Sequence, residues 1–420
     1  MCFFWKIFLM NRTRISLPLH YQIIIMLIAG GFFGYFFPSA APYINWMGDI
    51  FLRALNMIII PLILTSIITG VASVGSGGNL GRIGLKTVSF YVVSTLAAII
   101  TGFLLVSIIK PGTGSELGFS TPVENISVAA DSFGKTLIEI IPTNIFKSVA
   151  DGNMLSIIFF AVLFGYFITR INEKPRHSIM ELLNALLEVI MKITMFVIKF
   201  TPLGVFSISA KVISQQVLMG NDIGEVISRL GLYFITVLTG LLIHGLITLP
   251  LSVRLLGQAN PLKHLKNMAT PLLTAFSTSS SNATLPLTME AVEFKDGVSN
   301  KIASFTLPLG ATINMNGTAL YECVAVIFIA QAYGIELTHV QQLTIVFTAL
   351  LAAIGSAGIP MAGLVMMAVV LKAVGLPLEG IGLVLAVDRI LDMFRTTINV
   401  YGDTCAAVII AKSEGETLNI

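Results

Sequence analysis

A polar stripe runs along residues 387–403, in a part of the chain that is otherwise apolar. Its members are ionisable, amide or hydroxyl side chains: Asp388, Asp392, Arg395, Thr396, Asn399 and Asp403. At about 100° per residue, all of them fall within an arc of roughly 100° on one helix face. Ionisable groups at bilayer depth are costly, so they usually face a cavity and mark a substrate or ion path. The stripe therefore predicts a binding helix for a substrate, an ion or both.

A structural ion pair is the alternative explanation for this stripe. Asp392 and Arg395 lie three residues apart and could form a buried salt bridge that serves only the fold. One such bridge does not account for the other polar positions on the same face, so we favour the binding helix.

The composition shows which class of protein carries this helix. The chain has 420 residues, of which 55% are hydrophobic and 11% charged, whereas soluble domains carry roughly 25% charged residues. The sequence therefore predicts an integral membrane protein. The net charge of +3 is small, which argues against nucleic-acid binding. The three cysteines have neither metal-ligand nor redox spacing.

Apolar regions long enough to cross a bilayer precede residue 257. The predicted spans cover 21–37, 50–74, 87–109, 137–171, 179–214 and 226–256. With these spans, the basic clusters before the first span and after the second, fourth and sixth all fall on one side, which the positive-inside rule makes cytoplasmic. We expect a multi-pass protein of the plasma membrane, or of the inner membrane in a prokaryote.

The pattern changes after residue 257. The stretches Pro271–Glu290 and Val340–Ala373 have small and polar residues at their middle, where a full span would be apolar. Each therefore predicts a re-entrant pair of half-helices, because irregular backbone at membrane depth must be buried in protein or line a cavity. Each is followed by a predicted full helix, Ala303–Ala332 in the first case and the stripe helix in the second.

This repetition suggests an inverted repeat around a site at the membrane midplane. The predicted fold is all-α, with eight transmembrane helices and two re-entrant hairpins. Residues 1–256 would form the scaffold and part of a moving transport domain, and residues 257–420 the substrate and ion sites.

Four motifs resemble the dicarboxylate/amino acid:cation symporter family, which includes excitatory amino acid transporters and archaeal aspartate transporters. They are TSSSNATLP (278–286), GATINMNGTALYE (310–322), GSAGIPMAG (355–363) and DMFRTTINVYGD (392–403). The last motif is highly specific, and the resemblance extends from Tyr21 to about Lys412. It implies a homotrimeric elevator-type symporter, in which each protomer moves a transport domain against a scaffold.

The resemblance implies roles in binding an acidic amino acid. Arg395 would take the substrate's side-chain carboxylate, assisted by Thr318, because a guanidinium suits planar two-pronged carboxylates. Asp392 would pair with the α-amino group. The other implied contacts hold the α-carboxylate and amino group, or close over the ligand with backbone: Ser281, Thr396, Asn399, Ile359 and Gly363.

Sodium sites are also implied, built from oxygen ligands that suit a hard cation. The first consists of Gly310, Asn314, Asn399 and Asp403. The second would form when the second hairpin closes, from Thr312 and the backbone of Ala353, Ile354 and Ser356. The third would be lined by Tyr91, Ser94, Thr95, Asn314 and Asn316.

The chain departs from the family at two places. Asn316 stands where the family's NMDGT motif has a carboxylate, so the third site loses a charge. Ser279 stands where the archaeal transporters carry an arginine, and Met393 where the animal transporters carry one. Neither position is basic here, so Arg395 and its acidic neighbours must be supported in another way.

Glu322 is the candidate proton carrier. It lies four residues beyond Thr318, on the same helix face and in an apolar run that extends to Ile329. A carboxyl in such surroundings is able to carry a proton near neutral pH. The proton-coupled animal transporters resemble this chain in having glutamate here, whereas archaeal sodium-only members have glutamine. The alternative is a permanently protonated packing residue.

Other functions compete with a symporter of acidic amino acids. A C4-dicarboxylate carrier would leave Asp392 without an amino group to neutralise, and a neutral amino acid carrier would not need Arg395. An intramembrane aspartyl protease needs two carboxylates facing across a cleft, whereas these lie along one helix. A passive channel also remains, and transport against a gradient would distinguish it from a carrier.

Overall fold

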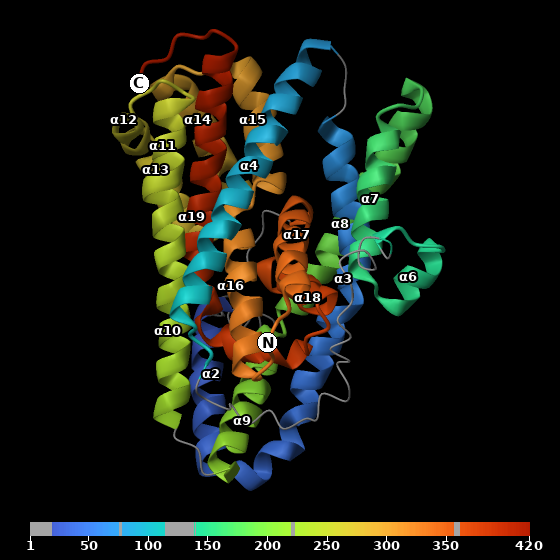
Figure 1. Ribbon diagram of the computed structural model, residues 1–420, viewed down its shortest axis with the longest axis vertical. Coiled ribbons are helices and arrows are strands. Elements are labelled where there is room, and N and C mark those ends of the chain that lie inside the picture. The colour runs from blue at the N-terminus through green and yellow to red at the C-terminus, as the bar shows by residue number, and fades with distance from the viewer. Residues whose placement is uncertain (1–18, 75–77, 114–137, 139, 220–222, 357–361) are drawn as a thin grey trace, which may run out of the picture.

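The computed structural model describes residues 19–74, 78–113, 138, 140–219, 223–356 and 362–420. Every regular element in these residues is a helix, which confirms the all-α prediction. Most helices run along the long axis of an elongated molecule (Figure 1).

Helices from the first half of the chain form one packed group. They are α2 (Leu19–Phe36), η1 (Pro38–Ile44), α3 (Asn45–Val74), α6 (Ile145–Asp151), α7 (Met154–Ile168), α8 (Glu173–Ile198) and α9 (Thr201–Met219). α3 packs against α7, α8 and α9, while α9 lies along α2. α2 stops just before Pro38, as predicted, because proline has no amide hydrogen with which to continue the helix.

A second set of helices packs against the C-terminal half. They are α4 (Gly78–Ile109), α10 (Ile223–Ile243), η2 (His244–Thr248), α11 (Leu249–Leu255) and α12 (Pro261–Asn267). α4 and α10 both pack against the last helix of the chain. α4 begins well before the predicted start at residue 87, and its Ile83 is buried in an apolar cluster with Leu249 and Val253. Tertiary packing thus outweighs the low helix propensity of glycine there.

The first predicted hairpin is a pair of short helices, α13 (Ala269–Thr278) and α14 (Ser281–Ala291), which we call hairpin 1. η3 (Val292–Asp296) follows it. At the tip, Ser279 takes the left-handed conformation with φ of 50°, and the Ser280 hydroxyl accepts a hydrogen bond from the backbone of Ala283. This cap starts α14 and turns the chain back on itself.

The second predicted hairpin is α17 (His339–Gly355) and α18 (Ala362–Ala373), which we call hairpin 2. Residues 357–361, including Ile359, lie outside the described residues. η4 (Leu378–Gly380) leads into α19 (Ile381–Ser413). Figure 1 places hairpin 2 near the middle of the molecule and α12 to α14 at the end where the C-terminus lies.

The predicted helix over Ala303–Ala332 lies within one helical segment of membrane-spanning length, Asn300–Ala332, but this segment is interrupted. The structure has two helices there, α15 (Asn300–Ile313) and α16 (Asn316–Ala332), separated by Asn314 and Met315 in non-helical conformations. The Asn314 side chain donates a hydrogen bond to Asp403 on α19. A side chain that hydrogen-bonds to a distant residue can stabilise an interruption in a helix, and the sequence pattern does not show such a contact.

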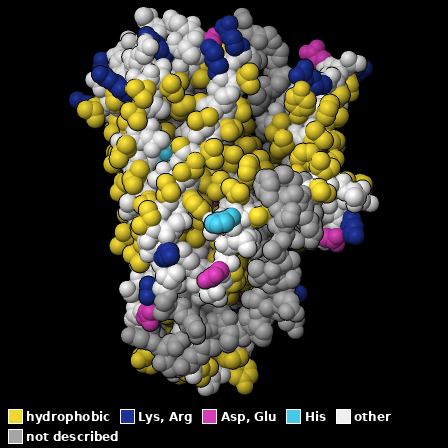
Figure 2. All heavy atoms as spheres, viewed as in Figure 1, with side chains coloured by type: hydrophobic (Ala, Val, Ile, Leu, Met, Phe, Trp, Pro, Cys, Tyr) yellow, Lys and Arg dark blue, Asp and Glu magenta, His cyan; other side chains and the backbone are white. Residues whose placement is uncertain are grey.

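Four helices in the described part of the chain are long and apolar enough to cross a membrane, or five if α8 and α9 form one bent span. α2 and α7 are apolar but shorter. Figure 2 shows hydrophobic side chains across the middle of one face and most of its Lys and Arg side chains near the upper end. This distribution suits an integral membrane protein.

Candidate functional site

The polar stripe on α19 is buried along its whole length. Arg395 and Asp388 are each only 1% exposed, and the other members are nearly as inaccessible. α19 packs against α13, α15 and α16, so hairpin 1 and the broken helix surround the stripe. The sequence prediction that the stripe faces the protein interior is confirmed.

Arg395 lies between two carboxylates. Its Nη2 is 2.9 Å from Asp392 Oδ1 and 3.1 Å from Asp388 Oδ1. The guanidinium carbon lies 3.8 Å from the ring centre of Tyr321, a cation–π contact. Nε and Nη1 have no hydrogen-bond partner among the described residues, although both are buried. We call Tyr321, Asp388, Asp392 and Arg395 the arginine cluster.

Hairpin 2 packs against this guanidinium through Gly363 of α18. A Cβ atom built on Gly363 would lie 2.9 Å from Arg395 Nη1 and 3.3 Å from Thr318 Cγ2. A side chain at position 363 would therefore displace the guanidinium of Arg395. The structure brings together Gly363, Thr318 and Arg395, three residues to which the family resemblance gives substrate contacts.

Asn399 joins α19 to the start of α16. Its Oδ1 accepts a hydrogen bond from the backbone of Gly317 at 2.8 Å, and its Nδ2 donates to Thr318 Oγ1 at 3.2 Å. Thr396 and Ser281 are both buried, and Ser281 is the first residue of α14 in hairpin 1. Hairpin 1 and α16 thus close on the stripe from two directions.

Three of the four residues predicted for the first sodium site also meet, whereas Asn399 contacts the start of α16. Asn314 Nδ2 donates to Asp403 Oδ1 at 2.8 Å, while Asn314 Oδ1 is buried without a partner among the described residues. A Cβ atom on Gly310 would lie 2.4 Å from Asp403 Oδ1 and 2.6 Å from the Tyr91 hydroxyl, so this position requires glycine. The Asp403 carboxylate and the unpartnered Asn314 oxygen fit Na⁺, because this ion prefers oxygen ligands.

The second predicted sodium site spans two elements. Thr312, on α15, is exposed, and its hydroxyl donates to the Leu309 carbonyl at 3.0 Å. Ala353 and Ile354 are in the last turn of α17, which packs against α15. Ser356 ends that helix, and its hydroxyl is buried without a partner among the described residues. Carbonyl groups at a helix C-terminus carry negative partial charge, which suits a cation.

The third predicted site is a closed hydrogen-bond network. Thr95 donates to Asn316 Oδ1 at 2.7 Å, and Asn316 Nδ2 donates to Ser94 Oγ at 2.7 Å. The same amide nitrogen lies 3.3 Å from His244 Nε2. Tyr91 donates its hydroxyl hydrogen to the Thr306 carbonyl. Both ends of the Asn316 amide are engaged in this network, so an ion bound here would replace at least one of these hydrogen bonds.

Glu322 is fully buried in α16, one residue from Tyr321 of the arginine cluster. Neither of its carboxyl oxygens has a hydrogen-bond partner among the described residues. Leaving an ionised carboxylate in such a place is costly, so this group is suited to hold a proton.

Sequence reasoning misses two contributors to the arginine cluster. It places Asp388 in the stripe but gives it no role, although Asp388 pairs with Arg395. It treats Tyr321 only as part of a motif, yet the tyrosine ring lies against the guanidinium. The four-and-three spacing of Asp388, Asp392 and Arg395 is a usable signal for the first, whereas nothing in the sequence pairs Tyr321 with α19.

Comparisons with known proteins agree with this geometry. A proton/sodium-glutamate symport protein of Geobacillus stearothermophilus is 36% identical over 415 residues, covering 96% of this chain and 96% of that protein. Excitatory amino acid transporter 3 of Mus musculus is 39% identical over 421 residues, covering 88% of this chain and 79% of that protein. A proton/sodium-glutamate symport protein of Bacillus subtilis (strain 168) is 34% identical over 417 residues, covering 96% of this chain and 94% of that protein. The sodium:dicarboxylate symporter family matches residues 19–413, and this chain belongs to that family.

Proposed function

We propose that this protein is a secondary active symporter that takes up glutamate or aspartate together with cations. The observation that carries the proposal is the arginine cluster: a buried Arg395 with two nitrogens unpartnered among the described residues, beside Asp392. The named relatives transport glutamate or excitatory amino acids, which supports the same substrate class.

The cluster offers complementary charges for an amino acid with an acidic side chain. Nε and Nη1 of Arg395 donate to the side-chain carboxylate, while Asp392 accepts from the α-ammonium group. Asp388 stays beside Nη2 and keeps the guanidinium charge balanced in both states. Thr318, Thr396, Asn399, Ser281, Gly363 and Ile359 complete the substrate contacts in this proposal.

Sodium is the main coupling ion in this proposal. Asp403, Asn314, Gly310 and Asn399 bind one ion, and the unpartnered Asn314 oxygen supports the assignment. Thr312 with the end of α17 binds another when hairpin 2 closes, which links ion binding to gate closure. We assign no ion to the Asn316 network, because Asn316 supplies no carboxylate charge and its amide is engaged with Ser94 and Thr95.

Glu322 carries a proton. Its isolation from other hydrogen-bonding groups in the described residues, next to Tyr321 of the arginine cluster, supports this role. The relatives from Geobacillus stearothermophilus and Bacillus subtilis are named proton/sodium symport proteins. Coupling to both ions would suit a chain that has lost a charged sodium ligand at Asn316.

The chain crosses the plasma membrane several times, as a trimer of elevator-type protomers. α4 and α10, although N-terminal to residue 257, pack against α16 and α19 and move with them. α2, α3, α7, α8 and α9 stay as the scaffold. α3 and α9 form the contact surface with hairpin 2 and α19, along which the transport part slides.

Radiolabelled uptake into proteoliposomes tests the function. We expect glutamate or aspartate to accumulate above the external concentration when an inward sodium gradient is imposed, and more so with an added inward proton gradient. Succinate should compete weakly, because it offers Asp392 no ammonium group. Equal competition by succinate would replace this proposal with a C4-dicarboxylate symporter, and equilibration without accumulation would indicate a passive channel.

A further inference from the structure

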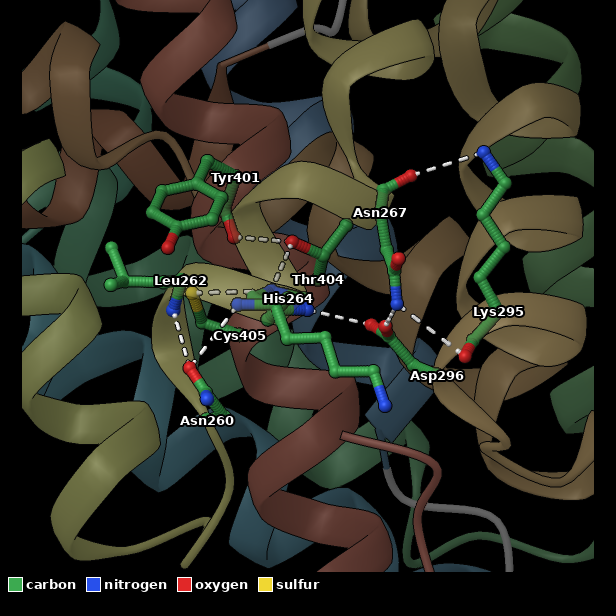
Figure 3. Close-up of polar contacts among 10 residues, drawn as sticks. Asn260, Leu262, His264, Asn267, Lys295, Asp296, Tyr401, Thr404 and Cys405 are labelled. Carbon is green, nitrogen blue, oxygen red and sulfur yellow. Dashed lines mark hydrogen bonds and ion pairs between the residues drawn. The ribbon is translucent and has the colours of Figure 1, made fainter.

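A second group of buried polar side chains lies at the base of hairpin 1, outside the substrate and ion sites. His264 Nδ1 is 2.6 Å from Asp296 Oδ2, and Asn267 Nδ2 donates to Asp296 Oδ1 at 2.7 Å. His264 Nε2 is 3.1 Å from Thr404 Oγ1 on α19. Figure 3 shows His264 between Asp296 and Thr404. We call these four residues the root cluster.

The root cluster joins three elements. His264 and Asn267 belong to α12, which precedes hairpin 1. Asp296 ends η3, which follows hairpin 1. Thr404 belongs to α19. The cluster therefore ties both ends of hairpin 1 to the helix that carries the substrate and sodium residues.

The hydrogen bonds determine how many protons the cluster holds. Thr404 has one hydroxyl hydrogen, which it donates to the Tyr401 carbonyl at 2.8 Å. The Tyr401 carbonyl is the nearer of the two acceptors open to that hydrogen, so we assign the hydrogen to it, and the Thr404 oxygen then accepts from His264 Nε2, which carries a hydrogen. A second hydrogen must lie between Nδ1 and Asp296 Oδ2, because two lone pairs cannot bond at 2.6 Å. The pair of His264 and Asp296 thus holds one proton more than a neutral imidazole and an ionised carboxylate, and its net charge is zero.

The buried surroundings favour a net charge of zero on the pair of His264 and Asp296. His264, Asp296 and Thr404 are fully buried, and an uncompensated charge in such a place is expensive. In the described part of the chain, Tyr401 is stacked on the imidazole at 5.5 Å, and the Cys405 sulfur is 3.7 Å from Nε2.

The flanking lysines are occupied elsewhere or lie apart from the pair. Lys295 donates to the Asn267 carbonyl at 3.3 Å, and Lys263 donates to the Asn419 carbonyl. Lys266 lies on α12 two residues beyond His264, so it points to a different side of that helix. The compensating charge for Asp296 therefore comes from the proton that it shares with His264.

Thr404 connects this pair to the proposed sodium site. It follows Asp403 directly, and successive helical side chains point about 100° apart. Thr404 faces His264 on α12, whereas Asp403 faces Asn314 beyond the end of α15. Fixing Thr404 therefore fixes the rotation of α19 at the level of Asp403.

We propose that the pair of His264 and Asp296 retains its proton throughout transport and acts through Thr404 to position Asp403 for sodium. His264, Asp296 and Thr404 are positioning residues, because none of them touches the ion or substrate. This inference rests on the proposed sodium role of Asp403.

The test compares Thr404→Val with Thr404→Ser. Valine keeps the shape but removes the oxygen that accepts from His264, whereas serine keeps the oxygen. The readout is the apparent unfolding temperature of the purified protein in detergent as sodium chloride replaces choline chloride, because an ion that binds the folded state stabilises it. We expect Thr404→Val to raise the half-saturating sodium concentration roughly tenfold, as for loss of a hydrogen bond from a charged donor, while Thr404→Ser retains the original value.

Asp296→Asn tests the retained proton. Asparagine keeps the pair at zero net charge, because its amide nitrogen donates to Nδ1 while the single N–H of the neutral imidazole, on Nε2, still donates to Thr404. We therefore expect Asp296→Asn to keep the original half-saturating sodium concentration. A purely structural role of Thr404 would lower the unfolding temperature of Thr404→Val without moving its sodium dependence.

The outcomes separate this inference from the proposed function. Equal sodium dependence in Thr404→Val and Thr404→Ser overturns the positioning role, even if sodium stabilises both. A raised half-saturating sodium concentration in Asp296→Asn overturns the retained proton, because it would show that an ionised Asp296 contributes to sodium binding. If sodium does not stabilise the unmodified protein, the sodium role of Asp403 fails, and the inference fails with it.

Discussion

Two buried polar clusters lie on the same helix, α19, and they differ in how completely their atoms are paired. In the root cluster, both nitrogens of His264 and both oxygens of Asp296 have partners within hydrogen-bond distance. In the arginine cluster, Nε and Nη1 of Arg395 have none among the described residues. An unsatisfied buried donor costs about 1–3 kcal/mol, and more if charged. The buried polar atoms of the root cluster are paired, whereas two donors of the arginine cluster are left open a few turns away on the same helix. This difference indicates that a ligand binds at the arginine cluster.

The largest effect should come from Arg395→Cys, which removes the open donors. We expect acidic amino acid uptake to fall by more than roughly 100-fold, because a buried charge pair loses about 3–5 kcal/mol when one partner is removed. Competition assays in proteoliposomes would show whether serine or alanine is now accepted. Arg389→Cys is the matched control, since Arg389 lies on the same helix and only its Nη1 approaches Asp392, at 3.3 Å. Unchanged aspartate affinity in Arg395→Cys would remove the basis of the substrate assignment.

Gly310→Ala tests whether the open oxygen at Asn314 belongs to an ion site. The added Cβ would lie 2.4 Å from Asp403 Oδ1, so the carboxylate or α15 must shift. We expect sodium half-saturation of uptake to rise about tenfold or more, in line with an overpacking cost of about 1–3 kcal/mol. Gly231→Ala is the control, because a Cβ there meets nothing within 4 Å. Identical sodium dependence in the two variants would argue against a sodium site beside Gly310.

The same contrast explains what the sequence can and cannot reveal. The residues of the stripe share one helix, so their spacing along the chain is enough to place them on one face. Both hairpins are predictable from small residues in the middle of apolar stretches. The root cluster is not, because His264 is 32 residues from Asp296 and 140 from Thr404, and no local pattern joins them.

The break in Ala303–Ala332 escapes prediction for a related reason. The stretch is apolar on both sides of Asn314 and Met315, and the contact of Asn314 with Asp403, 89 residues away, shows why the helix stops. Tertiary contacts between distant residues therefore decide the features that a local pattern cannot fix. Family resemblance supplies the roles of Gly363 and Gly310, and the structure adds the steric reason for a glycine at each.

Glu322→Gln sharpens the comparison within the substrate region, where Glu322 is another buried group without hydrogen-bond partners among the described residues. Glutamine has nearly the same shape and cannot titrate. We expect the variant to keep sodium-driven uptake but to lose the additional stimulation by an inward proton gradient. Uptake at two external pH values, with the sodium gradient held constant, measures this. A pH response that survives the substitution would show that another group carries the proton.

The smallest effect should come from a polar cluster that is exposed. At the C-terminal end of α19, Glu414 pairs with Arg82 at 2.5 Å and with Lys86 at 2.6 Å. Hydrogen bonds from Lys86 and then Arg82 lower the pKa of Glu414. The Arg82 and Lys86 side chains are 63% and 36% exposed, and that of Glu414 is 11% exposed. Pairs with solvent-exposed partners contribute only about 0–1 kcal/mol. Glu414→Gln should therefore lower the unfolding temperature only slightly and leave transport unchanged.

The pH dependence of this small contribution follows from the direction of the shift. Because the pKa of Glu414 is lower in the folded protein, its contribution is fully present above the ordinary glutamate value and is lost as pH falls through the lowered one. Salt should remove it too, since about 1 M salt shortens the screening length to roughly 3 Å. Unfolding temperatures of Glu414→Gln and the unmodified protein should accordingly converge at low pH or in high salt. If the difference in unfolding temperature persists in high salt, Glu414 acts by packing. Solvent exposure would then not explain why this cluster differs from the two buried ones.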